Sequence, residues 1–182
     1  MRAGNVIGGA DWAASRIVPD CVRAWQQDKA VEIRHPESTR PWQHVLEPLS
    51  GYLRCAQMLA QGNGKYNGEA YNFGPNADQS HTVKELLDRI SKYWEFKNLK
   101  NYFIVHANHS FHEAGLLKLN CDKSLHDLQW KPVLNFEQTA LYTSTWYSSY
   151  YREGKSDMFY FTVNQIDDFI EKAAEKGLAW AQ

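Results

Sequence analysis

The sequence predicts a mixed α/β fold, and three kinds of pattern predict it. Several segments repeat apolar residues at spacings of three and four, as amphipathic helices do. Shorter segments between them alternate or run apolar, as strands do. Glycine, proline and asparagine separate the two kinds of segment. Because no internal repeat or low-complexity linker interrupts the 182 residues, we expect a single unit, residues 1–182.

The first part of the chain is expected to alternate strands and helices. A small, apolar run at residues 3–7, ending in Gly8 and Gly9, predicts a buried strand. Residues 16–27 predict a helix with Pro19 in its first turn, residues 30–34 a strand, and residues 35–39 a turn. Residues 45–61 predict a second helix. Its apolar stripe would consist of Leu46, Leu49, Leu53, Ala56, Leu59 and Ala60.

The second part is expected to contain two strands and three helices. The strands are predicted at residues 69–73 and 102–105, the first followed by a turn at residues 74–76. Thr82 and Glu85 form a capping box for a helix that reaches about Trp94. An aromatic helix is predicted from residue 135 to about residue 151. Thr162 and Gln165 predict a second capping box, which would begin the last helix.

Composition limits the classes of partner. The chain is 43% hydrophobic and 14% aromatic, enough for a folded core, and its formal net charge of -1 gives no general attraction for nucleic acid or an anionic membrane. No window approaches a membrane span, and the N-terminus lacks the apolar core of a signal peptide. The three cysteines form no C-x-x-C pair. We therefore expect a cytoplasmic protein with neither nucleic acid nor membrane as a partner.

Three stretches carry more information than their secondary structure. The first is R-A-G-N-V-I-G-G-A-D-W at residues 2–12, followed by R-I-V-P-D at residues 16–20. The second is E-S-T-R-P-W-Q-H-V-L-E-P-L-S-G-Y at residues 37–52. The third is H-E-A-G-L-L-K-L-N-C-D-K-S at residues 112–124, with L-Q-W-K-P at residues 128–132. Together they extend over nearly the whole chain, apart from roughly the last thirty residues.

These stretches resemble the C-terminal part of the CDP-glucose 4,6-dehydratases, which are extended short-chain dehydrogenase/reductase proteins. The resemblance implies the end of a Rossmann-type sheet together with a small α/β substrate-binding domain. Two positions depart from the family pattern, since Ala10 and Gln129 stand where glycines are usual. These departures put only the local turn geometry in question.

The resemblance also implies an activity. In the intact family, NAD oxidises CDP-glucose at C4, water is eliminated across C5 and C6, and hydride returns to C6, which gives CDP-4-keto-6-deoxy-glucose. The residues that would bind the nucleotide sugar in this chain are Asn5, Arg16, Arg40, His112 and Glu113.

Each of these side chains has a chemistry that suits the assignment. Arg40, expected between a turn and a helix start, can grip a pyrophosphate with its planar guanidinium. Glu113, in a loop with His112, can accept hydrogen bonds from two ribose hydroxyls. Arg16 can pack on the face of a pyrimidine.

The cofactor and catalytic groups are expected outside this chain. A complete member needs a glycine-rich turn for the NAD pyrophosphate and a Tyr-x-x-x-Lys pair, and both would precede Arg2. We therefore expect no catalytic residue here, no NAD binding by this chain alone, and a separate N-terminal half as a possible partner. Family oligomers would form through that same missing part.

Several local patterns imitate functional motifs. The Gly62–Gly68 run is one residue too long for a dinucleotide fingerprint and follows a helix, so it predicts a turn. The pairs Tyr93/Lys97 and Tyr151/Lys155 have the catalytic spacing but lie downstream of the substrate motifs. The histidines at positions 106, 109 and 112 share no face of a helix or strand, which argues against a metal site. The aromatic run at residues 146–151 predicts core and rim packing in place of base stacking.

Two other functions remain open. The first alternative to the dehydratase is a non-catalytic or degenerate sugar-nucleotide-binding protein. The second is part of a related NAD-dependent nucleotide-sugar epimerase or reductase. The P-W-Q-H run at residues 41–44 argues against the second alternative, because other branches differ there.

Overall fold

A computed structural model describes residues 1–62, 64–106, 115–152 and 157–181. Its strands are short and form four two-stranded pairs. Strands β1 (Arg2–Ala3) and β6 (Asn72–Phe73) pair in parallel, as do β2 (Asn5–Ile7) and β5 (Trp42–His44). Strand β3 (Val31–Ile33) runs parallel to β8 (Phe103–Val105), and β4 (Thr39–Arg40) runs antiparallel to β7 (His81–Thr82).

The N-terminal strand changes partners at Gly4. The Gly4 N–H donates to the carbonyl of Phe73 on β6, whereas the Asn5 N–H donates to the carbonyl of Pro41 just before β5. A Cβ at Gly4 would lie 2.6 Å from that Pro41 oxygen, so a glycine is needed where the two neighbours meet. The single strand predicted at residues 3–7 is therefore two strands in the structure.

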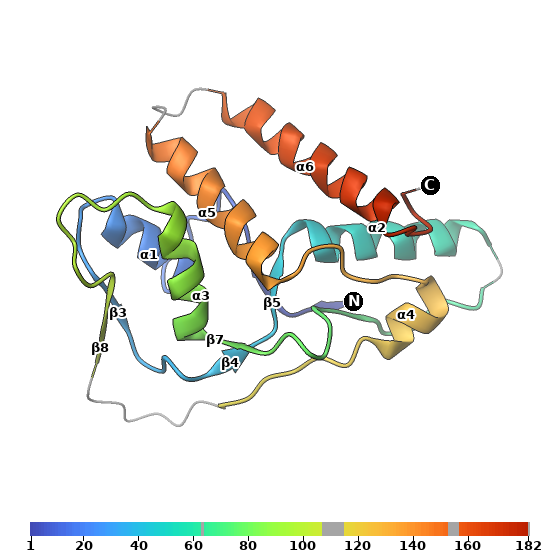
Figure 1. The fold of residues 1–182 in the computed structure, drawn as a ribbon. Helices are drawn as coiled ribbons and strands as arrows, with labels where there is room; N and C mark the ends of the chain where they lie inside the picture. The colour runs from blue at the N-terminus through green and yellow to red at the C-terminus, as the bar shows by residue number, and fades with distance from the viewer. Residues whose placement is uncertain (63, 107–114, 153–156, 182) are drawn as a thin grey trace.

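Six α-helices surround these strands (Figure 1) among the residues described. They are α1 (Ile17–Trp25), α2 (Leu46–Ala60), α3 (Val83–Ile90), α4 (Asp122–Leu128), α5 (Phe136–Arg152) and α6 (Met158–Glu175). A short 3-10 helix, η1 (Ser91–Tyr93), extends α3. In Figure 1, α1, α3 and the β3–β8 pair occupy one end of the molecule, and α2 and α4 occupy the other.

Two helices begin where the sequence predicts, and one does not. Thr82 and Glu85 form the predicted capping box of α3, and Asn135 and Gln138 exchange the same reciprocal bonds before α5. The predicted capping box at Thr162 is wrong, because α6 begins at Met158. Thr162 Oγ1 instead donates to the Met158 carbonyl and accepts a bond from the Trp146 indole at 2.9 Å. The hydroxyl therefore joins two helices.

Four elements were missing from the sequence prediction: strands β4, β5 and β7, and helix α4. Each strand has only two or three residues, too few to show a period. Helix α4 has seven residues and ends at Gln129, whose φ of 53° lies in the left-handed region. Ala10 also has a positive φ, 61°. Both positions that depart from the family's glycines thus adopt a backbone conformation that favours glycine.

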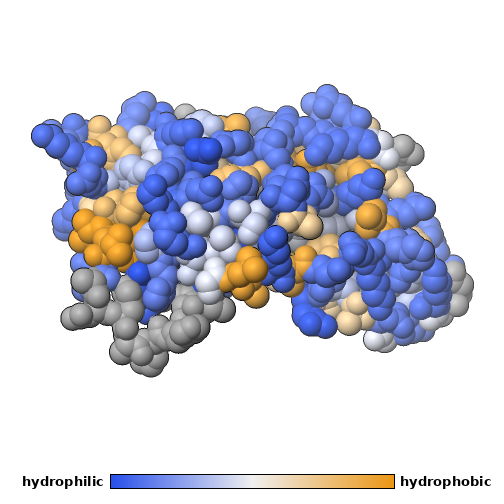
Figure 2. All heavy atoms as spheres, turned by 60° about the horizontal axis from the view of Figure 1, so that its bottom comes forward, coloured by the Kyte–Doolittle hydropathy of each residue, from blue (hydrophilic) through white to orange (hydrophobic). Residues whose placement is uncertain are grey.

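The core is divided into three clusters. The largest lies between α1, α3, α5 and the β3–β8 pair and includes the buried Trp25, Leu86, Leu87, Ile90 and Tyr147. A second lies around Phe73 and Trp130, and a third between α5 and α6 around Phe169. On the face shown in Figure 2, apolar side chains reach the surface in several separate places. No helix among the described residues is both long enough and apolar enough to cross a bilayer.

Candidate functional site

A pocket of about 560 Å³ opens beside strand β2 and the start of helix α1. Apart from Ser15 and Val83, its lining comes from the first two sequence motifs: Gly4, Asn5, Val6, Ile7, Gly8, Asp11, Ser15, Arg16, Ile17, Val18, Pro19, Arg40, Trp42 and Val83. Its volume falls in the range of small-molecule sites. We refer to it as the β2 pocket.

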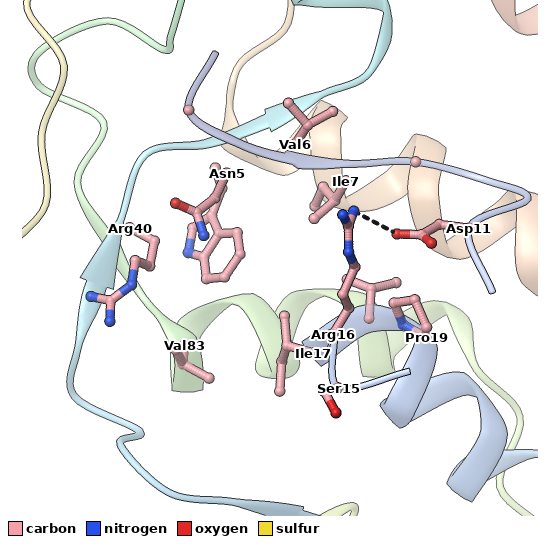
Figure 3. A pocket seen from close by; sticks show the side chains of 14 residues that line it. Asn5, Val6, Ile7, Asp11, Ser15, Arg16, Ile17, Pro19, Arg40 and Val83 are labelled. Carbon is pink, nitrogen blue, oxygen red and sulfur yellow. Dashed lines mark hydrogen bonds and ion pairs between the residues drawn. The ribbon is translucent and has the colours of Figure 1, made fainter. Parts of the chain in front are cut away.

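Three of the five predicted substrate residues line the β2 pocket. Asn5 is supplied by β2, Arg16 by the residue before α1, and Arg40 by β4. In the view of Figure 3, Arg40 and Arg16 lie on opposite sides of the pocket, with Asn5 between them. The fold therefore gathers residues that are up to 35 positions apart, although their role as substrate ligands remains a prediction.

The other two predicted residues, His112 and Glu113, lie outside the described residues. The same applies to His109 of the histidine pattern and to Lys155 of the second Tyr-x-x-x-Lys pair. His106 is described, and its Nε2 lies 2.9 Å from a carboxylate oxygen of Glu32 across the β3–β8 pair. Within the described ranges, no group of three metal-binding side chains comes together.

The two pocket arginines differ in environment. Arg40 is buried, with 9% of its surface exposed, and its Nη1 donates to the Thr39 carbonyl at 2.8 Å. Arg16 is 63% exposed and forms an ion pair with Asp11 at 3.2 Å. Because water screens exposed ion pairs, the Arg16–Asp11 contact contributes little to stability, and Arg16 is available to a competing anion.

The sequence analysis expected Arg40 between a turn and the start of a helix. The expected helix start directly after Arg40 is wrong. Strand β5 lies between Arg40 and α2, which begins at Leu46. The helix that opens on the pocket is instead α1, whose first turn supplies Ile17, Val18 and Pro19. Its N-cap residue, Arg16, forms no side-chain capping bond. The free N–H groups of a helix start favour an anion, and Asp20 in the same turn is a competing negative charge.

Asp11 is a pocket residue that the sequence analysis did not single out. Its backbone N–H donates to the Tyr147 hydroxyl at 3.0 Å, and that hydroxyl donates to the Asp11 carbonyl at 2.7 Å. Beside it, a Cβ on Gly9 would lie 2.2 Å from the Trp146 ring. Helix α5 therefore holds the loop that carries Asp11, and the aromatic run at residues 146–151 is core and rim as predicted.

The polar end of strand β5 lies next to the pocket's Gly8. His44 is buried, and burial lowers its pKa to about 4, so the imidazole is neutral at pH 7. Glu47, in the first turn of α2, accepts backbone hydrogen bonds from Val133 and Leu134, and burial raises its pKa to about 7. Glu47 thus connects α2 to the segment before α5, and the sequence analysis singled out neither His44 nor Glu47.

Comparisons with known proteins agree with the fold and with the motifs. The chain is 39% identical over 170 residues to a CDP-glucose 4,6-dehydratase from Salmonella typhimurium, which covers 93% of this chain and 46% of that protein. The chain thus spans about half the length of the curated relative that it matches. No protein-family model matches it.

Three similar solved structures are each longer than this chain. A dTDP-glucose 4,6-dehydratase from Bacillus anthracis in complex with NAD has a TM-score of 0.60 at 22% identity, over 86% of this chain and 44% of that one. An epimerase from Methanothermobacter thermautotrophicus reaches 0.68 at 18% identity, over 86% and 44%. A UDP-glucose 4-epimerase with UDP-glucose from Thermotoga maritima reaches 0.65 at 18%, over 84% and 45%. The fold is that of part of an extended short-chain dehydrogenase/reductase, as the motifs predicted.

Proposed function

We propose that this chain, homologous to a CDP-glucose 4,6-dehydratase over nearly its whole length, forms the nucleotide-sugar-binding part of an enzyme with that activity. The observation that carries the proposal is that Asn5, Arg16 and Arg40 line the β2 pocket together. They come from two sequence motifs, and one amide with two guanidiniums suits a polar, anionic ligand.

In this proposal the pyrophosphate binds on the Arg40 side of the pocket. Arg40 is the more buried cation, and a buried charge interacts more strongly with an anion than an exposed one. Arg16 would exchange its contact with Asp11 for the ligand, assisted by the free N–H groups at the start of α1. Asn5 can donate to and accept from hydroxyl groups.

In this proposal the NAD pyrophosphate does not bind to the described part of the chain. The one glycine pair that follows a parallel strand, Gly8 and Gly9, is filled by protein: a Cβ at Gly8 would meet Val45 at 2.8 Å, and one at Gly9 would meet the Trp146 ring. These glycines allow close packing and form no cradle for phosphate. In this proposal NAD and the groups that transfer protons and hydride belong to another part of the enzyme, and the chain contributes substrate binding.

Two surfaces support a separate N-terminal half as the partner. Strand β1 pairs only with β6 among the described residues, which leaves its other edge open for a further strand. Helix α2 exposes Leu49, Leu53 and Leu59, with Leu53 72% exposed. A row of leucines on one helix is typical of a surface that another part of a protein covers. The other half of the relative's length is long enough to supply both contacts.

Arg40→Ala tests the proposal. Removing one charge-assisted hydrogen bond costs about 1.5 to 3 kcal/mol, so calorimetric titration with CDP-glucose should give at least about tenfold weaker binding. Arg40→Lys should recover only part of the affinity, because a point charge does not reproduce the planar fork. Arg152→Ala is the control, since Arg152 is outside the β2 pocket and its variant should bind normally. Equal affinity for Arg40→Ala and the unchanged protein would remove Arg40 from the site.

A titration with UDP-glucose separates this proposal from the epimerase alternative. Tighter binding of UDP-glucose than of CDP-glucose would favour a related epimerase. Binding of CDP-glucose without any activity, when the missing half is supplied, would instead favour a non-catalytic sugar-nucleotide-binding protein. Turnover of CDP-glucose by the completed protein supports the dehydratase proposal.

A further inference from the structure

A second pocket of about 570 Å³ lies at the opposite end of helix α1 from the β2 pocket. It shares no lining residue with the β2 pocket, and we refer to it as the Trp94 pocket. Its lining comes from the end of α1, the segment after η1 and the end of α5: Trp25, Gln26, Gln27, Asp28, Trp94, Glu95, Lys97, Ser148, Tyr151 and Arg152. Nothing in the proposed nucleotide-sugar site uses these residues.

Aromatic rings form one wall of the Trp94 pocket. The Trp94 ring lies 5.8 Å from the Tyr151 ring and 5.8 Å from the Trp25 ring. Trp25 is buried, and its indole N–H donates to the Tyr102 carbonyl at 2.8 Å, which fixes the base of the wall. Trp94 and Tyr151 are only partly buried. Their rings therefore offer an apolar surface in a fixed position to a ligand with a flat, apolar face.

Polar groups of both signs surround these rings. Arg152 and Glu95 form an ion pair at 3.0 Å, so a hydroxyl near them meets a donor and an acceptor together. The Asp28 carboxylate accepts the backbone N–H groups of Lys97 and Asn98 at 3.3 and 3.0 Å, which joins the two sides of the pocket. Two amide side chains, Gln26 and Gln27, add further donors and acceptors.

The charges of the Trp94 pocket cancel. Asp28 and Glu95 contribute two negative charges, and Lys97 and Arg152 contribute two positive ones. A phosphate would meet two carboxylates and a quaternary ammonium would meet two cations, so neither gains a net electrostatic attraction. A neutral ligand with many hydroxyl groups does not depend on a net charge in the pocket. Its hydroxyls can donate hydrogen bonds to the carboxylates and accept them from the cations.

We propose that the Trp94 pocket binds a neutral saccharide, with the C–H face of a pyranose ring on Trp94 and Tyr151 and its hydroxyls on the Glu95–Arg152 pair. This site is independent of the proposed nucleotide-sugar site, because it needs neither phosphate nor the residues of the β2 pocket. A monosaccharide has about a dozen non-hydrogen atoms, and ordinary ligand efficiency gives it a Kd on the order of 1 mM.

The experiment is a titration of the complete chain, with the indole N–H signals of its tryptophans followed by NMR. The probes are methyl α-D-glucopyranoside, methyl β-D-galactopyranoside and maltotriose, with choline chloride and inorganic phosphate as charged comparisons. We expect at least one saccharide to shift the Trp94 signal and to leave the Trp130 signal unchanged, since Trp130 is outside the pocket and lies in the separate core cluster around Phe73. Neither charged probe should shift Trp94.

Two matched variants test the aromatic wall. Tyr151→Leu retains an apolar side chain but removes the ring, and it should weaken saccharide binding at least about tenfold. Tyr160→Leu makes the same change at an exposed tyrosine of α6 and should have no effect. If the NMR signals are dispersed, as in a folded protein, and no saccharide shifts the Trp94 signal, the proposal is overturned. A larger shift of the Trp94 signal with choline or phosphate than with any saccharide also overturns it. So does equal saccharide affinity of Tyr151→Leu and Tyr160→Leu.

Discussion

Helices α2 and α3 both carry a stripe of apolar residues, but α3 buries its apolar face and α2 buries its polar face. Helix α3 buries Leu86, Leu87 and Ile90 in the largest core cluster. Helix α2 turns most of its predicted apolar stripe outward, and its buried residues are instead Glu47, Pro48, Ser50, Gly51, Arg54 and Cys55. An apolar stripe therefore shows that a helix has something to cover, but it does not show that the cover lies in the same chain.

The two inward faces have different partners. Helix α3 packs against α5, whose aromatic side chains exclude water, so apolar burial stabilises it. The inward face of α2 meets strands β5 and β6 and the segment before α5, where backbone groups need hydrogen-bond partners. Glu47 supplies acceptors there, and Arg54 Nε donates to the Leu128 carbonyl at 2.9 Å. Polar residues face inward because the surface they meet is polar.

The largest expected effect concerns the exposed leucines of α2, where we propose that a separate N-terminal half binds. The isolated chain should neither bind NAD nor convert CDP-glucose, whereas addition of a separate N-terminal half should produce activity. Mass spectrometry of the product and calorimetry with NAD measure both results. Turnover of CDP-glucose by the pure chain alone would contradict the proposal that NAD binding and the catalytic groups belong to another part of the enzyme.

Paired leucine substitutions measure the difference between the two helices. Leu87→Ala in α3 removes a fully buried side chain and should lower the free energy of unfolding by about 2 to 5 kcal/mol. Leu53→Ala in α2 should change it by no more than about 0.5 kcal/mol in the isolated chain. We also expect the exposed leucines of α2 to cause self-association of the isolated chain, which Leu53→Ala should reduce. Chemical denaturation and light scattering give the two quantities. A large loss of stability for Leu53→Ala alone would show that this chain already covers that face.

The buried ionisable groups near α2 predict an unusual pH dependence. The native pKa of Glu47, about 7, lies above its unfolded value near 4.5, so its contribution to stability is full below pH 4.5 and is lost as pH rises through 7. The native pKa of His44, about 4, lies below its unfolded value of 6.5, so its contribution is full above pH 6.5 and is lost as pH falls. The two slopes oppose each other between about pH 4.5 and 6.5.

Glu47→Gln separates the two contributions. This variant should lose up to about 3 kcal/mol of its stability between pH 6.5 and 4, because only the His44 slope remains, while the unchanged protein varies much less. Denaturation midpoints measured across this range provide the test. Identical pH profiles for the two proteins would show that Glu47 does not titrate as its burial implies.

The smallest expected effect is at the end of α4. Gln129 has a φ of 53°, a conformation that costs a side chain about 1 kcal/mol and costs glycine almost nothing. Because glycine also makes the unfolded chain more flexible, Gln129→Gly should stabilise the protein by only about 0.5 kcal/mol. A thermal melt measures the change, and Gln138→Gly, within helix α5, should destabilise it instead.

The sequence by itself determined the fold class, the similarity to CDP-glucose 4,6-dehydratases and the approximate positions of the long elements. Periodic apolar residues are enough to locate α1, α2, α3 and α5, and the capping box of α3 depends only on Thr82 and Glu85. The motifs also proposed Asn5, Arg16 and Arg40 as substrate ligands, a prediction that used only the match to the motifs and the residue types.

Only the tertiary structure decided which residues meet and which faces are covered. The strands β4, β5 and β7 are too short to have a period of their own and exist because a neighbour pairs with them. The orientation of α2 depends on what lies beneath it, and the Asp11–Tyr147 and Glu47 hydrogen bonds join residues that are far apart in the sequence. Local patterns set which conformation each segment prefers, whereas burial and pairing depend on contacts between segments far apart in the sequence.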